Sequence, residues 1–185
     1  MPIFAKTYKI FTPMKKLIFP IAIGATMLLS AFTVYTATTW KIADGYSIKF
    51  TSDDPSGTFT SLKGGISFDE NDLASSKFNV LVDVNSINTG NGMKNSKAKG
   101  SQYFDADKFP TIKFTSSKVT KTAAGYEVAG TLDMHGVQKP ITIPFTFKNN
   151  TFIGGFNVNR IDYGVGTAGH AESILKIDLS VPVTK

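Results

Sequence analysis

Residues 126–147 read YEVAGTLDMHGVQKPITIPFTF, and this stretch decides the fold of the chain. In 126–134 every second residue, starting from the tyrosine, is apolar or glycine, and the alternation returns in 141–147. The polar break at 135–140 contains Gly136, which can adopt a positive φ. Alternation on both sides of such a break predicts a β-hairpin that buries one of its two faces.

Two prolines indicate details of the second strand of this hairpin. Pro140 can begin a strand, whereas Pro144 lies inside the second strand and indicates an edge or a bulge there, because proline cannot donate to the ladder. The apolar face of the hairpin needs a cover, and the rest of the chain can supply one only as further strands.

The same period-two pattern recurs along the chain, and helical periodicity is almost absent. Gly64-Gly65 interrupts one strand and indicates a bulge or a sharp bend, while 88–103 breaks the pattern and suggests a short helix with three lysines. The expected strands number about eight, at 46–51, 58–68, 76–87, 111–116, 126–134, 141–147, 152–160 and 173–183. We therefore predict an all-β chain that forms an eight-stranded antiparallel β-barrel, with a short helical insertion between strands three and four; an antiparallel sandwich is the alternative.

Most of the excess positive charge lies at the start of the chain. Four of the 20 basic residues and none of the acids lie in residues 1–37, which leaves 16 basic against 14 acidic residues in the remainder. The remainder has one arginine and no basic stripe, so we expect no nucleic-acid partner.

The first 37 residues resemble a targeting segment. Lys15 and Lys16 precede an apolar run over 17–32, which is the order of a secretory signal peptide. We expect residues 1–37 to be this signal, with Met14 as the true start, cleavage after Ala31 or Ala37, and a barrel domain over 38–185. An uncleaved membrane anchor is the alternative. The expected location is periplasmic or secreted, and the absence of cysteine excludes disulfides.

Signals for catalysis are missing from the sequence. The two histidines, His135 and His170, fall in a turn and a glycine-rich loop, without metal-ligand spacing. No Gly-x-Ser-x-Gly elbow and no phosphate-binding loop is present. We therefore expect no enzymatic activity, no metal and no cofactor.

An exported barrel with an apolar interior could enclose an apolar ligand, or its own side chains could fill it. Arg160 shares the parity of the inward residues of its strand, so its guanidinium is a candidate contact for an anionic head group; an internal pair with Asp162 or another nearby acid is the alternative. The residues expected to line the pore are Phe50, Phe78, Val80, Val82, Ile112, Phe114, Leu132, Ile143, Phe145, Phe156 and Leu179.

Several stretches resemble the YceI-like, polyisoprenoid-binding family. They are WKIAD at 40–44, FTSLKG at 59–64, VNSINTG at 84–90, YFD at 103–105 with FPTIKF at 109–114, GTLDMHGVQKP at 130–140 and NRIDYG at 159–164. The chain departs from many relatives at 94–100, where KNSKAKG replaces an acidic-basic pair and a His-Leu, so a head-group contact from that segment does not carry over.

The resemblance implies a lipocalin-like barrel that holds a polyisoprenoid or an isoprenoid quinone in its pore. It also implies export to the periplasm and, in many relatives, a homodimer, and a carrier of this kind would touch a membrane only transiently. The alternatives are an exported barrel with a self-filled core that acts as a structural or interaction protein, and an enzyme that acts on a lipid held in the pore.

Overall fold

The computed structural model describes residues 38–169 and 172–185, so the expected signal peptide at 1–37 and His170 lie outside the described part of the chain. The strands are β1 (Thr39–Ile42), β2 (Ser47–Thr51), β3 (Gly57–Phe59), β4 (Leu62–Ser67), β5 (Lys77–Asp83), β6 (Ile87–Asn88), β7 (Thr111–Thr122), β8 (Gly125–Met134), β9 (Val137–Lys148), β10 (Thr151–Asn159) and β11 (Ile174–Thr184). The helix α1 (Gly92–Lys99) and three short 3-10 turns, η1 (Leu73–Ser75), η2 (Val84–Ser86) and η3 (Arg160–Tyr163), complete the elements.

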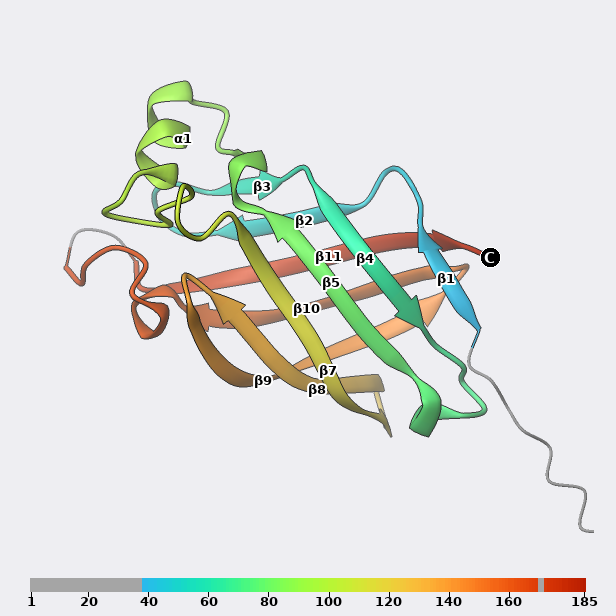
Figure 1. Cartoon of the computed structure of the whole chain (residues 1–185). Helices are drawn as coiled ribbons and strands as arrows, with labels where there is room; N and C mark the ends of the chain where they lie inside the picture. Colours follow the sequence, from blue (N-terminus) through green and yellow to red (C-terminus); the bar gives the residue numbers. More distant parts are fainter. Residues whose placement is uncertain (1–37, 170–171) are drawn as a thin grey trace, which may run out of the picture. The chain divides into compact units, whose positions relative to one another are not determined.

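These segments form one closed antiparallel barrel of eight strands (Figure 1). Three of the eight strands are interrupted, so that β1 with β2, β3 with β4, and β5 with β6 each act as one strand. β1 pairs with both β4 and β11, and β2 pairs with both β3 and β11, which closes the cylinder. The eight-stranded barrel and the helical insertion between the third and fourth strands are confirmed.

The β8–β9 hairpin is tighter than the sequence suggested. Met134 pairs with Val137, so the connection is only His135-Gly136, and both residues have positive φ, at 54° and 76°. A two-residue turn with positive φ at both positions matches the right-handed twist of the flanking strands. The expected apolar parity holds, because the residues from Tyr126 to Met134 alternate between half-exposed and buried.

The second strand of this hairpin pairs unevenly. β9 pairs with β8 from Val137 to Phe145, whereas its pairing with β10 extends only from Lys148 to Phe145, which lies opposite Gly154. The carbonyl of Pro144 faces β10, since a Cβ on Gly154 would lie 2.6 Å from that oxygen. Pro144 has no N–H to donate toward β10, and the pairing of β9 with β10 ends beside it. This agrees with the expectation that the proline marks an edge.

The glycine pair in β4 does not mark a bulge. The β4–β5 register is continuous from Leu62 opposite Val82 to Ser67 opposite Lys77. Gly64 has φ 130°, and a Cβ there would lie 2.1 Å from the carbonyl oxygen of Asn79. Glycine is required at this position because the two backbones approach closely. The register shift recorded between β7 and β8 lies at Ser116/Lys118 instead.

Candidate functional site

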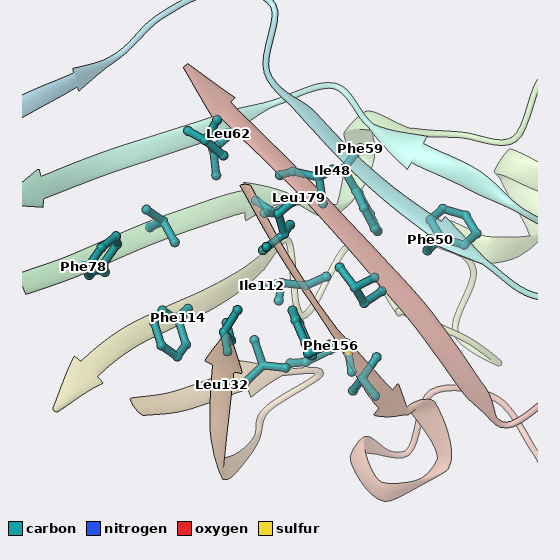
Figure 2. A pocket seen from close by; sticks show the side chains of 18 of the residues that line it. Ile48, Phe50, Phe59, Leu62, Phe78, Ile112, Phe114, Leu132, Phe156 and Leu179 are labelled. Carbon is teal, nitrogen blue, oxygen red and sulfur yellow. The ribbon is translucent and has the colours of Figure 1, made fainter. Parts of the chain in front are cut away.

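The barrel encloses a cavity of about 210 Å³ whose lining is entirely apolar. Its wall consists of isoleucine, leucine, valine, phenylalanine and methionine side chains, together with one glycine, Gly154. Figure 2 shows these side chains converging from the surrounding strands. An apolar void of about 150 Å³ in another protein stays dry and binds benzene, so a space of this size and character suits an apolar guest.

The interior is hollow rather than packed solid. Several side chains that line the cavity are only half-buried, including Val80, Ile112, Phe156 and Leu179. They point toward the barrel axis, so we attribute the area that they leave uncovered to the cavity that they border. A close-packed core would bury such residues almost fully.

All eleven residues that the sequence predicted for the pore line this cavity, although whether they contact a ligand remains a prediction. These residues were predicted from the alternation of apolar and polar residues along each strand. The same alternation also indicates most of the other residues of the cavity wall. The wall residues that were not named in advance are Ile48, Phe59, Leu62, Ile66, Ile87, Phe104, Val128, Met134, Phe152, Gly154, Val158, Leu175, Ile177 and Val181. Phe104 had no such signal, because it lies in the segment between α1 and β7.

One end of the barrel, here called the aromatic end, is closed by a cluster of rings: Trp40, Phe68, Phe78, Tyr126, Phe145, Phe147 and Phe152. Phe68 is 1% exposed and occupies the centre of this cluster. Polar contacts fix the cluster from outside: Trp40 Nε1 donates to the carbonyl of Phe68 at 3.0 Å, and the Tyr126 hydroxyl donates to Glu70 Oε1 at 2.6 Å. The hydrogen bond to Glu70, followed by burial, raises the pKa of Tyr126 to about 12.

The opposite end, here called the loop end, is covered by the turn 52–56, the segment 89–110, the His135-Gly136 turn and the loop residues 160–169 and 172–173. In Figure 1 this end carries α1. Phe104 is the part of this cover that reaches the cavity, and its ring meets Phe59 edge-to-face with centroids 6.0 Å apart.

Several polar contacts join the segments of the loop end, and two of them are exposed. Lys94 of α1 forms an ion pair with Asp54 of the 52–56 turn, and the backbone N–H of Asp53 donates to Glu172 at 3.2 Å. His135 Nδ1 lies 3.1 Å from the carbonyl oxygen of Tyr163. Burial, followed by the nearby Asp162 carboxylate, raises the pKa of the Tyr163 hydroxyl.

The structure places Arg160 away from the cavity wall, contrary to its strand parity. β10 ends at Asn159, and Arg160 begins η3, so the side chain no longer follows the alternation of the strand. Its Nε, Nη1 and Nη2 donate to the carbonyls of Glu172, Val165 and Thr167 at 2.9, 2.7 and 3.1 Å. Arg160, a residue that is 6% exposed, thus joins Val165, Thr167 and Glu172 of the loop that follows it. This placement argues against the head-group interpretation, and Asp162 contacts Asn159 and Lys139.

Across residues 38–169 and 172–185, no group of three or more histidine and acidic side chains could hold a metal ion. In the same part of the chain, no helix has the length and apolar character needed to cross a membrane.

Comparison with known proteins agrees with this geometry. The model of the YceI-like domain matches residues 35–184. The chain belongs to the YceI-like family. Among YceI-like relatives, the UPF0312 protein YE1254 of Yersinia enterocolitica is 32% identical over 136 residues, which cover 68% of this chain and 71% of that protein. The UPF0312 protein VVA0736 of Vibrio vulnificus is also 32% identical, over 66% of this chain and 72% of that protein.

Solved structures share the YceI-like barrel. BcnA of Burkholderia cenocepacia superposes with a TM-score of 0.72 at 25% identity, covering 78% of this chain and all of that one. A polyisoprenoid binding domain from Saccharophagus degradans, described as implicated in plant cell wall breakdown, gives a TM-score of 0.59 at 18% identity, over 79% of this chain and 97% of that one. At that identity the second likeness establishes the fold alone.

Proposed function

We propose that this chain is a periplasmic or secreted binding protein that encloses one long apolar chain, a polyisoprenoid or the prenyl tail of a quinone, for carriage or sequestration. The observation that carries the proposal is the wholly apolar cavity of about 210 Å³ inside a closed barrel. Binding rather than catalysis is proposed, because the cavity wall offers no acid, base or nucleophile.

The size of the cavity favours a slender ligand. Pockets for drug-sized molecules usually span about 300–1,000 Å³. A cavity of about 210 Å³ is smaller and therefore suits one unbranched or methyl-branched chain rather than a fused ring system. Each buried methylene contributes about 0.8 kcal/mol, so a chain of many carbons binds tightly even after the cost of ordering it.

The ligand class and the location have separate support. The YceI-like fold is shared with a domain that is described as polyisoprenoid binding. Export is supported by Lys15-Lys16 and the apolar run at 17–32. The expected homodimer and the transient membrane contact are part of the same proposal, and light scattering of the purified protein tests the first of them.

The test is to purify the protein from cells, extract it with organic solvent and identify lipids by mass spectrometry. We expect an isoprenoid at a fixed ratio to protein, and loss of that lipid in Val82→Trp, which fills the middle of the cavity. The matched control is Lys63→Trp, which adds the same ring at an exposed position on β4. Lipid-free extracts from folded wild-type protein would contradict the proposal and favour a structural or interaction protein.

A further inference from the structure

The cavity ends at a layer of rings that Phe68 supports from behind. Phe68 does not line the cavity, but its ring contacts three phenylalanines that do, at centroid distances of 6.2, 5.7 and 5.4 Å: Phe78, Phe145 and Phe152. Its ring also meets Tyr126 and Phe147, at 5.3 and 5.2 Å, and neither of these lines the cavity. The ring of Phe68 therefore fills the barrel axis beyond the end of the cavity.

Several bonds fix Phe68 in place. Its backbone N–H donates to the carbonyl of Thr38 at 2.9 Å, and its carbonyl accepts from Trp40. The turn that follows is fastened by the 1% exposed Ser76, whose Oγ accepts from the N–H of Asp69 at 3.2 Å. A residue held in this way on both sides behaves as a fixed stop, not as a lid that a ligand could push aside.

We propose that Phe68 sets the maximum length of the apolar chain that the barrel accepts. The inference rests on the proposed binding function and adds its length specificity. The tail of a chain inserted from the loop end reaches the ring layer in front of Phe68 and can go no further. Its polar end must stay at the loop end, because the cavity wall offers no polar side chain to receive it.

This arrangement predicts a cut-off in affinity. Each methylene that enters the cavity should strengthen binding about four-fold, whereas methylenes added after the tail reaches the stop remain in water and add little. Primary alkanols of increasing length are suitable probes, since they differ by single methylenes and carry one polar end. The affinity should rise with length and then level off.

The test compares cut-off lengths among variants, measured by isothermal titration with the alkanol series. Phe68→Ala should move the cut-off to longer chains, and Phe68→Leu should do so to a smaller extent if the alanine variant fails to fold. Val128→Phe should move the cut-off to shorter chains, because Val128 lines the cavity two residues from Tyr126 on β8. Phe104→Leu, the matched control at the loop end, should not move it to longer chains.

A second readout uses Trp40, the single tryptophan, which lies outside the cavity lining and contacts Phe147 at 5.3 Å. Long alkanols should change its fluorescence in Phe68→Ala but not in the wild type. Equal cut-offs in wild type, the Phe68 variants and Val128→Phe would overturn the inference while leaving the binding function intact. Failure of every alkanol to bind, together with lipid-free extracts, would overturn both.

Discussion

The two ends of this barrel are built from different interactions. The aromatic end is held by buried rings that interlock around Phe68, with hydrogen bonds from Trp40 and Tyr126 around them. At the loop end, Arg160 donates hydrogen bonds to backbone carbonyls, and exposed ion pairs such as Lys94 with Asp54 join neighbouring segments. Ring packing excludes water and resists opening, whereas exposed ion pairs contribute little to stability.

From this difference we expect the two ends to have different roles. We expect the aromatic end to contribute more to stability and to end the cavity, and we expect a guest to enter through the loop end. Local opening of a protein occurs where few buried apolar contacts hold a segment. Four variants test the comparison, from the largest expected effect on the free energy of unfolding to the smallest.

Phe68→Ala should have the largest effect. Removal of a fully buried phenylalanine costs about 3–5 kcal/mol, since it loses transfer free energy and leaves a cavity. Urea denaturation measures the loss. The control is Phe104→Ala at the loop end, where the ring is only half-buried and the loss should be distinctly smaller. Equal losses would show that the two ends are equally important for stability.

Arg160→Met should come next, with a loss of about 2–4 kcal/mol, because the carbonyls of Val165 and Thr167 lose charge-assisted donors. The damage should be local. Limited proteolysis should cut within 160–173 in the variant and spare the strands. Arg160→Lys serves as the comparison and should recover only part of the stability, since an ammonium cannot reproduce the planar set of donors. Cleavage throughout the barrel would contradict the view that Arg160 holds only this loop.

Tyr126→Phe should cost about 1.5–2 kcal/mol through the loss of the hydrogen bond to Glu70. The pKa of Tyr126 is raised to about 12, so its hydroxyl stays protonated in the folded state at a pH where the unfolded chain ionises. Its contribution is therefore complete below about pH 10, the ordinary tyrosine pKa, and is lost as pH rises toward 12. Denaturation curves between pH 8 and about 12 should show this decline in wild type, and the decline should be weaker in Tyr126→Phe.

Lys94→Ala should have the smallest effect, at most about 1 kcal/mol, because the side chains of Lys94 and Asp54 are 43% and 69% exposed. The effect should vanish in about 1 M salt, where the Debye length is only about 3 Å. Thermal melts at low and high salt measure it. A loss comparable to that of Phe68→Ala would mean that the loop end contributes to stability as strongly as the aromatic end.

Much of the fold was predictable from alternation alone. The parity from Tyr126 to Met134 identified the hairpin, and the same reasoning placed Phe78, Ile112 and Phe156 on the cavity wall. A strand has a period of two, so a short sequence already states which side chains share a face. The sequence did not predict that the turn has only two residues, because no neighbouring residue indicates that His135 adopts a positive φ together with Gly136.

The sequence by itself thus determined the eight strands and their apolar faces, because these follow from local alternation and turn chemistry, and it favoured a barrel over an antiparallel sandwich. Only the tertiary structure decided which end is closed and which residue closes it. Phe68 directly follows β4 and continues the parity of its inward residues, and only the fold surrounds it with five rings from other strands, on which its proposed role rests. Arg160 left its expected face when η3 turned its guanidinium toward the carbonyls of the loop that follows it. Such outcomes depend on how segments pack and turn in three dimensions, which strand alternation does not record.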